Sequence, residues 1–227
     1  MISEPVRVLV VAPHPDDETL GCGGSILKFR SRGIKVHWLI VTSAESLDGF
    51  DEQKLAARDL EIEAVSKDYT FEHVHQLGFP SARLDTLGKS VLVDSFANVL
   101  RDVQPDRVYI PYRNDAHSDH AEVFDAAVSA CKSFRANFLS SLYVYETLSE
   151  TEFGLRTDDP GFRPNLFEDI EGYLERKIEV MSRYASEMGE FPFPRSRKAI
   201  EALAALRGAQ SGFMAAEAFM ILKEVRR

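Results

Sequence analysis

Short runs of apolar and β-branched residues alternate along this chain with longer segments of helical period. The apolar runs are almost continuous, which is typical of strands covered on both faces. Such alternation predicts βα units and a doubly wound, parallel sheet. The predicted strands span 6–12, 35–42, 72–77, 106–111 and 141–146, and the predicted helices span 19–32, 51–67, 86–103, 119–133, 170–187 and 196–226.

The segment 149–167 separates the last predicted strand from the C-terminal helices and is rich in Gly, Pro and polar residues. That composition predicts a long loop, and loops of this length are often functional. The chain has no internal repeat or low-complexity tract, and 227 residues are a usual size for one globular domain. We therefore expect a single α/β domain over 1–227, with a mainly parallel sheet and C-terminal helices.

The chain is acidic, with a formal net charge of -9 and an isoelectric point near 5.2. This balance argues against a nucleic-acid ligand, because phosphate backbones attract basic surfaces. The first residues lack the pattern of a signal peptide, and no window reaches the roughly 18 apolar residues of a membrane span. We therefore expect a cytoplasmic protein without a membrane span. Cys22 and Cys131 are too few for a disulfide scaffold or a thiolate metal cluster, so both are expected to be buried thiols.

One histidine and three acids stand directly after the first predicted strand, in the stretch "VLVVAPHPDDETLGCGG". In open parallel α/β sheets, ligands bind beyond the carboxyl ends of the strands, which is where His14, Asp16, Asp17 and Glu18 are expected. His14 and Asp17 lie three residues apart in a strand-to-helix turn. An imidazole nitrogen and a carboxylate oxygen at this spacing can converge on one cation. Two ligands alone hold a metal poorly, so a metal site here needs further ligands from another part of the chain.

A second cluster follows the fourth predicted strand, in the stretch "VYIPYRNDAHSDH". Its members are Asp115, His117, Asp119 and His120. No thiolate accompanies these histidines, and a catalytic zinc site keeps about three protein ligands and an open position for water. With His14, Asp17 and His120 on a metal, Asp16 and His117 remain free for proton transfer or charge stabilisation. Together the residues form the inventory of a metal-dependent hydrolase.

The residues of the first cluster and the glycines beside it also have simpler interpretations. Its acids could cap the helix that starts near Thr19, but capping alone does not account for a second cluster at the same sheet edge. The adjoining stretch "GCGGS" (21–25) has neither the G-x-G-x-x-G nor the G-K-[ST] pattern of phosphate loops. Tight packing of this helix on the sheet therefore explains the glycines better than phosphate binding does.

Other charged and titratable residues carry weaker signals. Arg58 and Glu61 have helical spacing, which by itself predicts a surface pair. His37, His73 and His75 lie within strand patterns, and we expect them to be packed or surface residues rather than ligands.

The motifs "APHPDDE" (12–18) and "DAHSDH" (115–120) together resemble the LmbE-like, or PIG-L, family of metal-dependent N-deacetylases, which remove acetyl groups from N-acetylglucosamine-type sugars. The segments "FRPNLFEDIEGYLERKIEVMSRYAS" and "EALAALRGAQSGFMAAEAF" look like the C-terminal half of bacterial members, on spaced residues that include Asn165, Asp169, Arg207, Gly208 and Glu217. The resemblance covers almost the whole chain. It implies a single Rossmann-like, three-layer α/β domain.

The resemblance also implies roles for individual residues. His14, Asp17 and His120 would bind a divalent metal, usually zinc, with iron as the alternative. Asp16 would be the general base that activates water, and His117 would stabilise the oxyanion and could protonate the leaving amine. The remaining assignments are Asp115 and Asp119, which would orient imidazoles, and Arg58, which would lie near the sugar.

Three positions depart from the usual family pattern: Ala44 where glycine is common, Ser118 where proline is common, and Glu187 where glutamine is frequent. The ligands survive these changes, so they affect substrate choice more than catalysis. The loops 43–50, 78–86 and 149–167 are expected to select the group attached to the sugar. Relatives often form homo-oligomers, so the resemblance allows for one here.

Two other function classes fit the sequence. A metallohydrolase of another N-acyl or phosphoester bond would use the same residue types, although a phosphate substrate favours a second metal about 3.5 to 4 Å from the first. The number of metal ions bound per chain would distinguish a phosphoesterase of this kind from a deacetylase. A non-catalytic sugar-binding relative is the other class, because a fold does not guarantee an activity.

Overall fold

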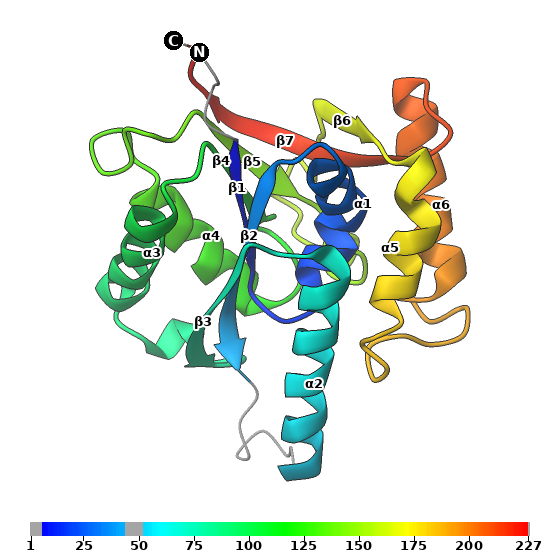
Figure 1. Cartoon of the computed structure of the whole chain (residues 1–227), viewed down its shortest axis with the longest axis horizontal. Helices are drawn as coiled ribbons and strands as arrows, with labels where there is room; N and C mark the ends of the chain where they lie inside the picture. Colours follow the sequence, from blue (N-terminus) through cyan, green and yellow to red (C-terminus); the bar gives the residue numbers. More distant parts are fainter. Residues whose placement is uncertain (1–5, 44–51, 227) are drawn as a thin grey trace.

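The computed structural model of the chain describes residues 6–43 and 52–226, which form one seven-stranded sheet with helices on both faces (Figure 1). The strand order is β3-β2-β1-β4-β5-β7-β6. The first five strands in this order are parallel, and β7 is antiparallel to both of its neighbours. The strands are β1 (Arg7–Ala12), β2 (Lys35–Ser43), β3 (His73–Pro80), β4 (Arg107–Pro111), β5 (Ser141–Tyr145), β6 (Leu166–Asp169) and β7 (Ala216–Glu224).

The helices form two layers, which confirms the three-layer α/β prediction. One face of the sheet carries α1 (Asp17–Ser31), α2 (Glu52–Tyr69), α5 (Leu174–Met181) and α6 (Arg197–Ser211). The other face carries α3 (Lys89–Val103) and α4 (Ser118–Ala130). Short 3-10 turns, η2 (Leu84–Thr86) and η3 (Glu171–Tyr173), precede α3 and α5. Within the described residues, no helix has both the length and the apolar character that crossing a membrane requires.

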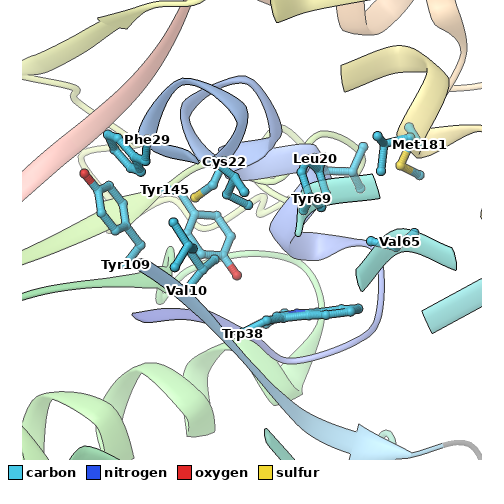
Figure 2. Packing of buried hydrophobic residues seen from close by; sticks show 14 of the residues in the cluster. Val10, Leu20, Cys22, Phe29, Trp38, Val65, Tyr69, Tyr109, Tyr145 and Met181 are labelled. Carbon is cyan, nitrogen blue, oxygen red and sulfur yellow. The ribbon is translucent and has the colours of Figure 1, made fainter. Parts of the chain in front are cut away.

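Helix α1 packs unusually close to its neighbours because three glycines remove the side chains that would separate them. A Cβ atom on Gly21 would lie 2.2 Å from Cδ2 of Tyr145, and one on Gly24 would lie 2.7 Å from Cγ2 of Ile170. This confirms that the glycine-rich stretch serves packing. Figure 2 shows Cys22 and Phe29 of α1 pointing toward the tyrosines of the sheet, and Cys22 is 1% exposed, as expected for a buried thiol.

The prediction for the C-terminus is wrong in one respect: the helix over 196–226 ends at Ser211, and 216–224 is a strand. Gly212 ends the helix in the left-handed conformation, with φ of 79°, which glycine adopts without steric cost. The chain then pairs with both β5 and β6. The sequence "AEAFMILKE" is compatible with a helix or a strand. Pairing with the edge of β5 favours the strand.

The segment 162–187 also differs from its prediction. Strand β6 forms at the end of the expected loop, and α5 ends at Met181 rather than near 187. Residues 182–196 then follow an irregular path between α5 and α6. This path brings Glu187 and Arg195 back over the carboxyl end of the sheet.

A buried ion pair anchors the C-terminal elements on α1. Glu217 of β7 accepts hydrogen bonds from the backbone N–H groups of Gly24 and Ser25, both at 2.8 Å. Lys177 of α5 donates to Glu217 at 2.7 Å and to the carbonyl oxygen of Leu20 at 2.8 Å. Two charged side chains, one from α5 and one from β7, therefore hold α1, the helix that begins at the candidate site.

Candidate active site

The two clusters of acids and histidines meet at the carboxyl edge of the sheet. Strands β1 and β4 are direct neighbours, and the chain leaves β1 toward β2 on the side opposite β4. This is the topological switch point at which open α/β sheets form a crevice. A cavity of about 600 Å³ lies there, and residues of both clusters line it, including His14, Asp16, Asp17 and His117.

The turn after β1 holds its acids in a fixed arrangement. The backbone N–H of His14 donates to Oδ2 of Asp17 at 2.9 Å. Asp16 has φ of 134°, a conformation that costs a non-glycine residue energy and that clusters at functional sites. Glu18 turns away from the cavity, accepts hydrogen bonds from the Asp16 N–H (3.1 Å) and the Tyr184 hydroxyl (2.9 Å), and so stabilises the strained turn. Burial raises the pKa of Glu18 to about 7.

His14, Asp17 and His120 offer three ligand atoms that lie within 4.8 Å of one another. Oδ2 of Asp17 is 3.3 Å from Nδ1 of His14 and 3.4 Å from Nε2 of His120. Burial lowers the pKa of His14, but hydrogen bonds to Asp119 and Asp17 outweigh it and raise this pKa to about 9. The surrounding carboxylates therefore stabilise positive charge at this point, which is the electrostatic environment that a cation needs.

His120 is the most informative of these residues because it is fully buried and only half satisfied. Its Nδ1 donates to Oδ2 of Asp115 at 2.7 Å, and Oδ1 of Asp115 accepts from the Thr151 hydroxyl at 2.6 Å. Its Nε2 is buried and has no hydrogen-bond partner among the described residues. A buried polar atom without a partner is costly, so this nitrogen fits the role of a metal ligand. Two histidines and a carboxylate are a donor set that zinc and iron both accept.

A second group of potential ligands, His14, His117 and Asp119, shares one histidine with the first. Asp119 is already engaged: Oδ2 accepts from the Ala82 N–H at 2.7 Å and from Nε2 of His14 at 3.1 Å. Its other oxygen accepts from the Leu84 N–H at 3.3 Å. These contacts suit a residue that orients His14, and the unpartnered nitrogen of His120 favours the first group as the metal ligands.

Asp16 lies in the cavity wall beside a cation that the sequence analysis missed. Nη1 of Arg195 donates to Oδ2 of Asp16 at 2.8 Å. Burial raises the pKa of Asp16 well above its usual value, the charge of Asp17 raises it further, and Arg195 acts in the opposite direction. Arg195 belongs to a Pro-rich turn 179 residues away in sequence and carries no local motif, so only the tertiary structure reveals this contact.

The geometry around His117 defines which of its nitrogens carries the proton. Nδ1 accepts a hydrogen bond from the backbone N–H of Asp119 at 3.2 Å, so the proton of the neutral ring is on Nε2. Burial, followed by the neighbouring charge of His14, lowers the pKa of His117 to about 4. The side chain is therefore a neutral hydrogen-bond donor near pH 7. Glu150 fixes its backbone by accepting the His117 N–H at 3.0 Å.

Arg58 lines the cavity, so the surface interpretation of this residue is wrong. Its side chain is 14% exposed and contacts Glu61 at 3.4 Å. It also pairs with Glu187, one of the residues that departs from the family pattern. The other departures are less informative: Ser118 is the first residue of α4, and Ala44 lies outside the described residues together with most of the loop 43–50.

Three histidines were predicted to lie apart from the site, and they do. His37, His73 and His75 cluster on β2 and β3, where the rings of His73 and His75 are 4.4 Å apart, and they do not line the cavity.

The loop 149–167 was predicted to be functional, but its sequence did not single out Glu150 and Thr151. Their contacts with His117 and Asp115 give that segment its place in the site.

Comparison with known proteins extends these observations. A model of the PIG-L family, described as GlcNAc-PI de-N-acetylase, matches residues 9–131. The diacetylchitobiose deacetylase of Thermococcus kodakarensis is 27% identical over 227 residues, which cover 93% of this chain and 81% of that protein.

Solved structures show the same fold at lower identity. The N,N'-diacetylchitobiose deacetylase of Pyrococcus horikoshii aligns with a TM-score of 0.75 at 22% identity, over 97% of this chain and 85% of that one. GalB, the 4-carboxy-2-hydroxymuconate hydratase of Pseudomonas putida, aligns with a TM-score of 0.74 at 19% identity, over 98% of each chain. The fold is thus found in a hydratase as well as in deacetylases, and it does not fix the reaction.

The family match is a stronger finding than the shared fold, because it covers more than half of the chain and includes both clusters of acids and histidines. The protein therefore belongs to the PIG-L family.

Proposed function

We propose that the protein is a metal-dependent N-deacetylase that hydrolyses the acetamide of an N-acetylglucosamine-type sugar and releases acetate. The observation that carries this proposal is the unpartnered Nε2 of buried His120. This nitrogen lies 3.4 Å from Asp17 and belongs to the same ligand group as His14. Asp17 and His14 line the cavity, and its wall also contains a carboxylate and an imidazole outside this ligand group, Asp16 and His117. Family membership and the deacetylase relative support the same reaction.

His14, Asp17 and His120 would hold the metal, with Asp119 and Asp115 orienting the two imidazoles through the hydrogen bonds described above. A divalent ion held there supplies Lewis-acid chemistry, because it polarises a carbonyl oxygen and lowers the pKa of water to about 7. Zinc is the ion that we expect, and iron suits the same ligands.

Asp16 would act as the general base. A carboxylate whose pKa is raised by burial accepts a proton from water more readily at neutral pH than an exposed carboxylate does. Arg195 holds one oxygen of this carboxylate at 2.8 Å and so fixes its orientation in the cavity. As water adds to the acetamide carbon, its proton passes to Asp16.

His117 would donate a hydrogen bond from Nε2 to the oxygen of the former carbonyl, on which negative charge develops. Donors of this kind contribute about 10²- to 10³-fold in rate. Because His117 is neutral near pH 7, the proton that Asp16 has accepted is the better source for the leaving amine. Transfer of that proton to nitrogen breaks the C–N bond and leaves acetate and the free amino sugar.

The proposal is tested by acetate release from N-acetylglucosamine conjugates, with chelated protein compared with protein reloaded with zinc or ferrous iron. The panel contains the free sugar, diacetylchitobiose, and inositol-, malate- and nucleotide-linked forms. We expect release by the reloaded protein alone. Absence of release from every conjugate by protein that retains its metal would contradict the proposal and favour another acyl or phosphoester bond.

A further inference from the structure

We infer that the cavity selects N-acetylglucosamine conjugates whose remaining part is uncharged, and that Glu187 excludes anionic conjugates. This inference rests on the proposed function and adds to it a substrate class and a specificity-determining residue. Three independent features of the cavity carry it: the balance of charge in its wall, the pairing of its arginines, and the chemistry of the polar atoms that lack partners.

The charge of the wall is predominantly negative. Five carboxylates and two guanidinium groups line the cavity among the described residues. Asp16 and Asp17 belong to the catalytic end, where a divalent cation would offset them. Asp59, Glu150 and Glu187 remain along the rest of the wall, so an anionic group on the substrate would meet like charges.

Both arginines of the cavity are already neutralised. Glu187 pairs with Nη2 of Arg58 through one carboxylate oxygen, and its other oxygen lies 3.1 Å from Nη1 of Arg195. Arg195 also donates to Asp16 at 2.8 Å. Arg58 has further contacts with the Glu61 carboxylate at 3.4 Å and with the Pro15 carbonyl at 3.4 Å.

An anion could replace Glu187 at Nη2 of Arg58 and Nη1 of Arg195 only by displacing its carboxylate. The three side chains are between 14% and 23% exposed, so solvent screens their interaction only in part. Glutamine at this position would leave both arginines with less negative charge nearby. A single carboxylate therefore controls whether the cavity attracts an anionic group.

Among the described residues that line the cavity, three buried polar atoms lack hydrogen-bond partners, and two of them belong to uncharged groups. The hydroxyls of Thr147 and Ser149 and the Nε of Arg195 are buried, and none has a hydrogen-bond partner among the described residues. All three residues line the cavity. Buried groups of this kind favour a ligand that supplies matching donors and acceptors, and sugar hydroxyls and acetamides do so without adding charge.

The experiment uses two ligands that share the sugar and carry an uncharged or an anionic group on the anomeric oxygen: methyl N-acetyl-α-D-glucosaminide and N-acetyl-α-D-glucosamine 1-phosphate. Their dissociation constants are measured by calorimetry on metal-loaded wild type, on Glu187→Gln and on Glu63→Gln. Glu63→Gln removes a carboxylate from an exposed pair with Lys67 on the same helix as Arg58, and so controls for net charge. Direct coordination of phosphate by the metal contributes equally to all three proteins, so it cancels in the change of phosphate affinity from the wild type to each variant.

We expect the wild type to bind the methyl glycoside at least about tenfold more tightly than the phosphate. In Glu187→Gln, phosphate affinity should rise by about tenfold, while glycoside affinity changes by less than about threefold. Glu63→Gln should behave as the wild type. Equal or tighter phosphate binding by the wild type would overturn the inference, as would equal shifts for both ligands in Glu187→Gln or no binding of either ligand.

Acetate release is recorded separately on the same samples. Preferential binding of the glycoside without any release would reject the proposed deacetylation and retain the charge selectivity. Release from both ligands at equal catalytic efficiency, together with equal affinities, would support deacetylation and reject the selectivity. The two failures are therefore distinguishable.

Discussion

Asp16 and Asp17 are adjacent in the chain and equally buried, yet their surroundings move their pKa values in opposite directions. Burial raises the pKa of both carboxyl groups. For Asp17 the nearby imidazoles of His120 and His14 outweigh burial and lower its pKa below the usual range. For Asp16 the charge of Asp17 adds to the effect of burial. Such divergence between neighbouring carboxyl groups is a general sign of divided roles, and it agrees with the proposed roles of Asp17 as ligand and Asp16 as base.

The division of roles predicts different losses for two substitutions. Asp16→Asn should keep the bound metal and lower kcat by about 10²- to 10⁴-fold, because the amide cannot accept the proton. His120→Ala should lose the metal itself, since it removes a fully buried nitrogen that faces Asp17 at 3.4 Å. Metal content by elemental analysis and acetate release measure the two effects. Equal metal loss in both variants would contradict the assignment.

At the scale of elements, helix α1 connects packing with the site. It begins at Asp17, and its glycines allow close contact with β5 and with the segment before α5. The same helix receives the buried Glu217–Lys177 pair. The proposed ligand at the start of the helix therefore depends on packing contacts made further along it.

Gly21→Ala should destabilise the protein by about 1–3 kcal/mol, because the new methyl group would overlap the Tyr145 ring. Gly172→Ala is the matched control, since a Cβ atom there meets nothing within 4 Å. Guanidinium unfolding at pH 7 measures both changes. A Gly21→Ala protein as stable as the control would show that α1 can move away from the sheet without cost.

The environment of His37 on β2 predicts that this residue lowers the stability of the folded protein in acid. Burial, followed by the charge of His75, lowers the pKa of His37 to about 4, whereas an unfolded chain has a histidine pKa of 6.5. The unfolded chain therefore binds a proton between pH 6.5 and 4 that the folded protein does not, and stability falls as the pH drops through this window. Because the side chain is only partly buried, we discount the effect for solvent screening to about 1 kcal/mol.

His37→Gln removes this titration. The stability of the variant relative to the wild type should increase by about 1 kcal/mol when the pH changes from 7 to 5. Urea unfolding at the two pH values measures the difference, and His73→Gln, an exposed substitution on the neighbouring strand, serves as the control. A relative stability of His37→Gln that does not change between pH 7 and 5 would contradict the prediction.

For the whole molecule, the site joins segments that are distant in sequence. The proposed metal ligands follow β1 and β4, while Arg195 and Glu187 come from the segment between α5 and α6. A cation bound between β1 and β4 would therefore stabilise the centre of the sheet. Binding to the folded state alone raises stability by RT ln(1 + [L]/Kd).

Metal removal should consequently lower the melting temperature. At a metal concentration about 1,000 times its Kd the stabilisation is about 4 kcal/mol, which corresponds to roughly 10 °C for a chain of this size. Differential scanning calorimetry of chelated and zinc-loaded protein measures the shift. The shift should be absent in His120→Ala, and an equal shift in that variant would place the stabilising metal elsewhere.

Some features of the protein follow from its sequence alone, and others follow only from its tertiary structure. The sequence by itself determined the parallel half of the sheet and the meeting of the two clusters, because apolar periodicity marks strands and carboxyl ends of neighbouring parallel strands share one edge. Only the tertiary structure decided that 216–224 is a strand and that Glu187 joins Arg58 to Arg195. These outcomes depend on long-range contacts with segments that carry no local signal, so no short stretch of sequence encodes them.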